Sequence, residues 1–150
     1  MASFLTSLDG LANALKNDTA LSAFCSTNFA GRSLSIEKTF KKRVQISSND
    51  LPTIILTRPS IVKSFLNNNV LHSVHTVLLY AGFYQKDYRH ALDLFVKFEE
   101  SIEDALWRIT PESLGVMSIV PKNSLNDEGL YHPIYFLTME VEIQHRRIKT

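Results

Sequence analysis

The chain has 150 residues, of which 45% are hydrophobic and 21% are charged, and its formal net charge is +1. This length suits one domain with its own core, and the composition excludes an intrinsically disordered chain. A net charge near zero argues against bulk attraction to nucleic acid, and no apolar run is long enough to span a bilayer. The N-terminus lacks a basic start and Asp9 interrupts its apolar stretch, so we expect no secretory signal and a reduced, buried Cys25 in a cytoplasmic chain.

The first third of the chain is expected to hold short elements. Residues 3–16 should form an amphipathic helix because apolar side chains recur there at helical spacing: Phe4, Leu8, Leu11 and Leu15. A second short helix is expected around 21–25, before Gly31 breaks the pattern. The segments 33–36 and 43–47 are strand candidates.

Residues 53–57 are mostly β-branched and aliphatic, which predicts a strand, and Pro59 is expected to end it. The next segment, 60–69, fits either one helical turn or a loop, and its three consecutive asparagines favour the loop. It is apolar for a loop, since it contains Phe65 and Leu66. It therefore suits docking on another part of the fold or on a neighbouring subunit.

Residues 70–84 are expected to form a long central strand that is covered on both faces in its second half. One face would carry Leu71, His75, Val77, Leu79 and Phe83, and the other His72, Val74, Leu78, Tyr80 and Tyr84. An odd separation along a strand sends side chains to opposite faces. His72 and His75 are therefore not expected to bind one metal together.

Residues 87–109 predict one long amphipathic helix. Asp87 suits the helix N-terminus, and the helix should stop before Pro111 because a residue that precedes proline disfavours helical geometry. The apolar stripe expected to pack on the sheet contains Tyr88, Ala91, Leu92, Phe95, Phe98, Ile102, Leu106 and Ile109. The opposite face carries Asp93, Lys97, Glu100 and Asp104. Glu99 falls inside the stripe, and we expect it at the edge with its carboxylate in water.

The C-terminal part predicts a strand over 114–120, a polar loop over 123–129 and a long strand over 133–147. In the last strand the side chains that alternate toward the core are Tyr135, Leu137, Met139, Val141 and Ile143. Together these elements predict an α+β fold. A mixed or antiparallel sheet of four to five strands would pack against one long helix and an N-terminal helix.

No pattern of reaction chemistry is present. The five glycines are isolated, so the sequence contains neither a phosphate-binding loop nor a dinucleotide fingerprint, and there is no nucleophile elbow. His90, His132 and His145 are scattered along the chain. We therefore expect no catalytic residue, no metal site and no cofactor.

The order of the elements resembles that of the tail-terminator (tail-completion, minor tail) proteins of tailed bacteriophages. The resemblance is one of pattern and topology and covers nearly the whole chain. It is carried by an N-terminal helix containing DGLANAL, the proline-led strand DLPTIIL, the long strand HSVHTVLLYAGFYQ, a helix that opens KDYRHALDLF and ends EDALW, and the final strand HPIYFLTMEVEIQHR.

This resemblance implies a ring, commonly of six subunits, at the head-proximal end of the tail tube. Such a ring stops polymerisation of the tube protein and docks the head connector, and DNA passes through its lumen. The chain would assemble in the host cytoplasm and reside in the virion, with no cofactor and no membrane. A head-completion or neck protein is the close alternative.

Two sets of candidate contact residues follow. A basic cluster and two apolar residues would meet a neighbouring subunit, the tube or the connector: Lys41, Lys42, Arg43, Phe65 and Leu66. The acidic residues Asp93, Glu100 and Asp104 would face the channel or solvent, because a cationic lumen would bind DNA phosphates.

Two other classes stay open. The first is a small metal-dependent enzyme that uses histidines. The second is a nucleic-acid-binding module that uses the basic clusters at 41–43 and 146–149, although exposed loop and terminal charges explain both clusters more simply.

Overall fold

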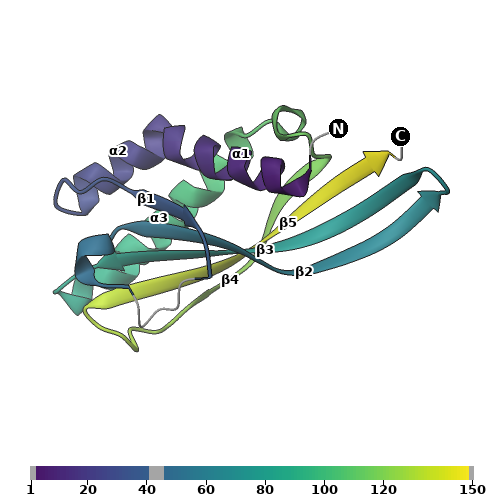
Figure 1. The fold of residues 1–150 in the computed structure, drawn as a ribbon. Coiled ribbons are helices and arrows are strands. Elements are labelled where there is room, and N and C mark those ends of the chain that lie inside the picture. Colours follow the sequence, from purple (N-terminus) through teal and green to yellow (C-terminus); the bar gives the residue numbers. More distant parts are fainter. Residues whose placement is uncertain (1–2, 41–45, 149–150) are drawn as a thin grey trace.

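A computed structural model describes residues 3–40 and 46–148 and has the predicted α+β fold (Figure 1). The elements are, in chain order, α1 (Phe4–Asn17), α2 (Thr19–Asn28), β1 (Ser35–Lys38), the 3-10 helix η2 (Ser48–Asp50), β2 (Thr53–Asn67), β3 (Val70–Tyr84), α3 (Tyr88–Arg108), the 3-10 helix η3 (Pro111–Leu114), β4 (Ser118–Asn126) and β5 (Ile134–Ile148).

The sheet has five strands in the order β1-β2-β3-β5-β4, so β3 is central as predicted. β1 runs parallel to β2, and the other pairs are antiparallel, which makes the sheet mixed. All three helices lie over one face of the sheet (Figure 1). The alternation in β5 places Leu137, Met139 and Val141 under the helices, where each is at most 1% exposed.

The two N-terminal helices follow the predicted pattern. Leu11 and Leu15 of α1 are fully buried, and Cys25 of α2 is buried as expected. Asp18 accepts a hydrogen bond from the backbone N–H of Leu21 and so caps α2. Its carboxylate also binds the Arg108 guanidinium at 2.7 and 2.8 Å, which ties α2 to the end of α3. This bidentate pairing is the main reason why the pKa of Asp18 is lowered.

α3 begins after Asp87, whose side chain accepts from the N–H of Arg89, and it ends at Arg108, close to the predicted bounds. Its sheet-facing residues are Ala91, Phe95, Phe98, Ile102, Ala105 and Leu106. The predicted stripe is wrong at its N-terminal end, because Tyr88 is 72% and Leu92 is 65% exposed. Here the turn between β4 and β5 stands away from the helix and leaves a hollow beside both side chains.

β2 continues to Asn67, so the prediction that Pro59 ends it was wrong, and so was the prediction of a loop over 60–69. The pairing of β2 with β3 shifts register between Thr57 and Ser60, and Pro59 lies in this irregularity. β1 pairs with β2 only as far as Leu56. On the β1 side of β2, no strand among the described residues lies beside Pro59, so its missing N–H leaves no ladder hydrogen bond unmade there.

β4 begins at Ser118 and extends to Asn126, so the strand predicted over 114–120 and the loop predicted from 123 were both placed too early. Residues 111–114 form η3, which ends at Gly115 with a left-handed φ of 71°. β1 likewise lies two residues later than predicted. Most of the strand predicted over 43–47 falls outside the described residues. In the described ranges, no helix is both long and apolar enough to cross a membrane.

Candidate assembly surfaces

One end of the sheet extends beyond the helices as a three-stranded projection (Figure 1). We call this projection the arm and define it as residues 57–77 and 143–148. Residues 60–67 of β2 pair only with β3, because β1 stops at Lys38. The last residues of β5 likewise pair only with β3, because β4 begins opposite Gln144. Within the described residues, both edges of the arm are open to a further strand.

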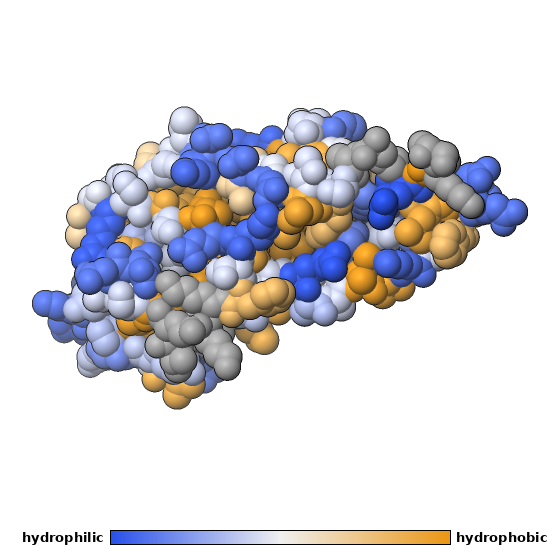
Figure 2. Space-filling model, in the orientation of Figure 1, coloured by the Kyte–Doolittle hydropathy of each residue, from blue (hydrophilic) through white to orange (hydrophobic). Residues whose placement is uncertain are grey.

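The arm is basic and partly apolar. It carries four cations on two of its strands, Arg58 and Lys63 on β2 and Arg146 and Arg147 on β5, and contains no Asp or Glu. The sequence revealed the basic run at 146–149 but not its closeness to Lys63, because only the strand register brings Lys63 and Arg147 to the same end of the sheet. Large apolar side chains are also exposed there: Val62, Phe65, Leu66 and Ile148. Figure 2 shows this mixture of hydrophobic and hydrophilic surface on the projecting end.

Two histidines are buried at the root of the arm, under the start of α1. The His75 ring stacks on Phe4, with ring centroids 3.5 Å apart, and lies 6.0 Å from the His145 ring. Burial, together with the nearby charges of Arg58, His145 and Lys63, lowers the pKa of His75 to about 4. His72 lies on the opposite face of the sheet from His75, as strand alternation predicted. The His72 ring contacts the side chain of Gln144. The closeness of His75 and His145 was not predicted, because it too depends on the strand register.

The second surface is an apolar pocket at the start of α3, which we call the α3 pocket. It has a volume of 380 Å³. It lies between the first turns of α3 and the turn that joins β4 to β5, and it is lined by Tyr88, Ala91, Leu92, Phe95, Asn126, Glu128, Gly129, His132 and Tyr135. This feature was also missed, because a pocket depends on how far a turn stands from a helix.

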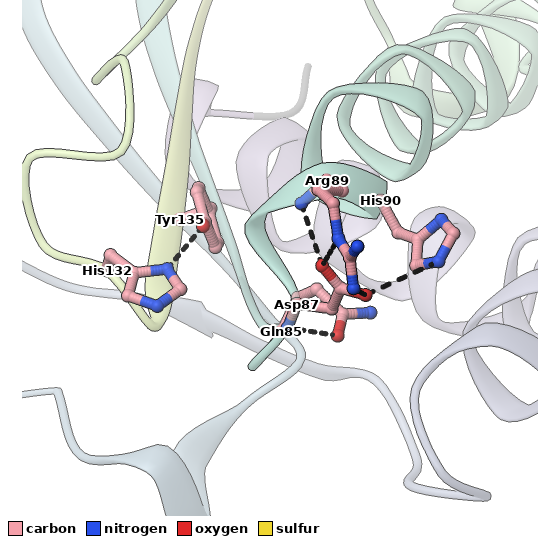
Figure 3. A network of polar contacts seen from close by, with 6 residues as sticks. All are labelled: Gln85, Asp87, Arg89, His90, His132 and Tyr135. Carbon is pink, nitrogen blue, oxygen red and sulfur yellow. Dashed lines mark hydrogen bonds and ion pairs between the residues drawn. The ribbon is translucent and has the colours of Figure 1, made fainter.

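Two groups of polar contacts lie near the start of α3, and His132 and Tyr135 of one group line the pocket (Figure 3). The Asp87 carboxylate accepts from the backbone and side chain of Arg89, which lowers the pKa of Asp87, and lies 3.5 Å from the His90 ring. On the sheet side, His132 hydrogen-bonds the Tyr135 hydroxyl. Burial raises the pKa of Tyr135, and the carboxylates of Asp127 and Asp87 add to this effect. Tyr135 is therefore a neutral phenol and not an activated nucleophile.

The acidic side chains of α3 form a third surface. Asp93, Glu100 and Asp104 are exposed, whereas Glu99 and Glu103 are half-buried. Burial raises the pKa of Glu103, and the nearby Glu99 carboxylate raises it further. The clustered carboxylates make this face negative, and Lys97 on the same face offsets part of their charge. The role of this face in assembly stays a prediction.

The structure describes only some of the other predicted contact residues. Phe65 and Leu66 lie beside the turn at the tip of the arm, where they are 74% and 52% exposed. The basic cluster Lys41, Lys42 and Arg43 falls outside the described residues. The acidic face belongs to a helix above the main part of the sheet, so it and the arm tip are separate surfaces.

Charge reversal tests the solvation of the acidic face. The double variant Asp93→Lys with Glu100→Lys is expected to change the free energy of unfolding by no more than roughly 0.5 kcal/mol, because both side chains are exposed. Urea denaturation followed by circular dichroism measures this change. A double variant that fails to fold would mean that this face is buried and that the helix orientation is wrong.

The described residues offer little for reaction chemistry. No group of three or more His, Cys, Asp or Glu side chains in 3–40 and 46–148 is placed to hold a metal ion. Burial raises the pKa of Cys25 to about 12, so its thiol is a poor nucleophile at neutral pH.

Neither the family models nor the curated proteins contain a match to this sequence. The fold, however, is similar to that of a chain in the virion of a native gene transfer agent (GTA) particle. The TM-score is 0.52 at 8% sequence identity, and the match covers 90% of this chain and 90% of that chain. At this identity the similarity establishes a shared fold.

Proposed function

We propose that this chain is a structural virion protein that forms a closed ring at the end of a phage tail tube. The ring terminates polymerisation of the tube and joins the tail to the head connector. The observation that carries this proposal is the fold similarity to a GTA virion chain over 90% of both chains. It agrees with the tail-terminator resemblance of the element order, which was drawn from the sequence alone.

The arm supports self-association. An open strand edge with exposed apolar side chains is a surface that folded proteins normally cover. The arm combines two such edges with the exposed tip residues Phe65 and Leu66. If the arm of one copy contacts a different surface of the next copy, the contact is head-to-tail, and such contacts close into rings when the rotation permits.

The distribution of charge supports an arrangement within the ring. We place the acidic face of α3, with Asp93, Glu100 and Asp104, toward the channel or the solvent. A negative or neutral lumen lets DNA pass, whereas a cationic lumen would bind its phosphates. The basic cluster at 41–43 would then contact a subunit, the tube or the connector. If Lys41→Glu with Lys42→Glu leaves ring formation and tail joining unchanged, this placement is wrong.

The ring itself is tested by light scattering. The purified protein is expected to form an oligomer of defined mass, commonly six subunits, either alone at high concentration or when tail tubes of the same virus are added. A monomer in dilute solution agrees with the proposal, because assembly can wait for the tube. A strict monomer at high concentration and with tubes present contradicts it.

A nucleic-acid-binding module is the second candidate, and the observation that favours it is the basic arm. Four cations in an arm that itself contains no Asp or Glu suit a contact with phosphates. This candidate predicts DNA binding that persists at physiological salt and falls steeply as salt rises. Binding that is absent at that ionic strength would exclude it.

A further inference from the structure

We propose that the arm tip of one copy inserts Phe65 and Leu66 into the α3 pocket of the next copy in the ring. The inference rests on the proposed ring and names the contact that builds it. The occupant of the pocket is thus a second copy of this chain. Shape, chemistry and charge each support this assignment.

The tip and the pocket lie at opposite ends of the molecule. The arm tip is the turn between Asn67 and Val70, whereas the α3 pocket lies just beyond Tyr84, at the other end of β3. β3 has 15 residues, which is a length of roughly 45 Å at the usual rise of a strand. A chain therefore cannot fill its own pocket, and a tip-to-pocket contact must join different copies head-to-tail.

The two surfaces are chemically matched. Phe65 is 74% exposed and lies near the end of the β2–β3 hairpin, where it pairs with Leu71. The pocket offers apolar walls from Leu92 and Phe95, and its volume of 380 Å³ is within the range that holds a drug-sized ligand. Aromatic side chains in fully desolvated pockets dominate the energy of many protein interfaces.

The charges of the two ends are opposite. The segments 57–77 and 143–150 contain five of the 16 Lys and Arg residues and none of the 15 Asp and Glu residues, so the rest of the chain has a formal charge of −4. At the pocket, Glu128 is part of the lining and Asp127 is next to it. The pocket lining contains no Lys or Arg, and Arg89 in the first turn of α3 is paired with Asp87. A basic arm would therefore approach an acidic rim, which favours the head-to-tail orientation.

Matched aspartate substitutions test the contact. Phe65→Asp at the tip and Leu92→Asp in the pocket should each weaken ring assembly by roughly thirtyfold or more, the effect of losing a hot-spot side chain. The control for the tip is Val62→Asp, which is 67% exposed on the opposite face of the same strand. The control for the pocket is Val96→Asp, one turn further along α3 and outside the pocket lining. Both controls should assemble like the wild type.

Cysteine cross-linking between two variants gives a direct readout. Leu66→Cys in one tagged copy and Leu92→Cys in another should form a disulfide-linked heterodimer on mild oxidation, while Leu66→Cys with Val96→Cys should not. Cys25 can stay in place because it is fully buried. A heterodimer that forms only with the pocket position supports the contact.

The possible results of these experiments distinguish failure of the tip-to-pocket contact from failure of ring formation. Wild-type rings that persist in both Phe65→Asp and Leu92→Asp would overturn the tip-to-pocket contact and leave the proposed function intact. Loss of assembly in all four variants would also overturn it, since the effect would not be specific to tip and pocket. A wild-type protein that stays monomeric even when tail tubes are present would contradict both the proposed function and the tip-to-pocket contact.

Discussion

Replacing Phe83 with alanine is expected to lower the free energy of unfolding by about 3–5 kcal/mol, which is typical of a large aromatic side chain removed from a core. Phe83 is 1% exposed and links the sheet to the helices. Its ring centroid lies 5.2 Å from that of Phe29, 5.8 Å from Phe95 and 5.4 Å from Tyr135. The cavity would open where α2, α3 and β5 meet, so the surroundings cannot easily collapse.

Urea denaturation at neutral pH measures this loss, and Phe65→Ala is its control. Phe65 is the same residue type but is mostly exposed at the arm tip, so its removal should change the stability of the monomer by roughly 0.5 kcal/mol or less. Equal losses in the two variants would mean that Phe83 does not hold the layers together. For the comparison, both variants must be measured as monomers.

The second large effect is a loss of stability in acid that depends on His75. The folded protein holds the pKa of His75 at about 4, whereas an unperturbed histidine titrates near 6.5. Between these values the unfolded chain binds a proton that the folded chain does not. Stability is therefore complete above about pH 6.5 and falls as the pH drops toward 4, by roughly 3 kcal/mol in total from this group.

The variant His75→Phe should remove most of this dependence. Phenylalanine can keep the stacking on Phe4, and it removes the buried Nε2 of His75, which has no hydrogen-bond partner among the described residues. At pH 7 the variant should be at least as stable as the wild type, with a flatter curve between pH 6.5 and 4. His90→Gln is the control, because that side chain is 70% exposed and should keep the wild-type slope. An unchanged slope in His75→Phe would assign the acid sensitivity to other groups.

Long periodic segments were predictable from the sequence because their patterns are local. The strand over 70–84 has the predicted bounds, and the helix after Asp87 is within a residue of them. β2 was cut short because proline normally ends a strand. Whether Pro59 is tolerated depends on how far β1 extends beside it, which no local pattern reveals.

The candidate surfaces were harder to predict for the same reason. Phe65 and Leu66 were predicted as contact residues because they are apolar residues in a segment expected to be a loop, and they lie at the exposed arm tip. The basic arm joins cations that are more than 80 residues apart in sequence, at Lys63 and Arg147, and only the pairing of three strands brings them together. The α3 pocket exists because Leu92 does not pack on the sheet, although its spacing fits the buried stripe.

Negative-stain electron microscopy of the purified protein mixed with growing tail tubes tests the central claim most directly. The account predicts a ring of uniform diameter at one end of each tube, and tubes that stop growing once the ring is bound. Tubes with bare ends that elongate at the same rate with and without the protein would contradict it.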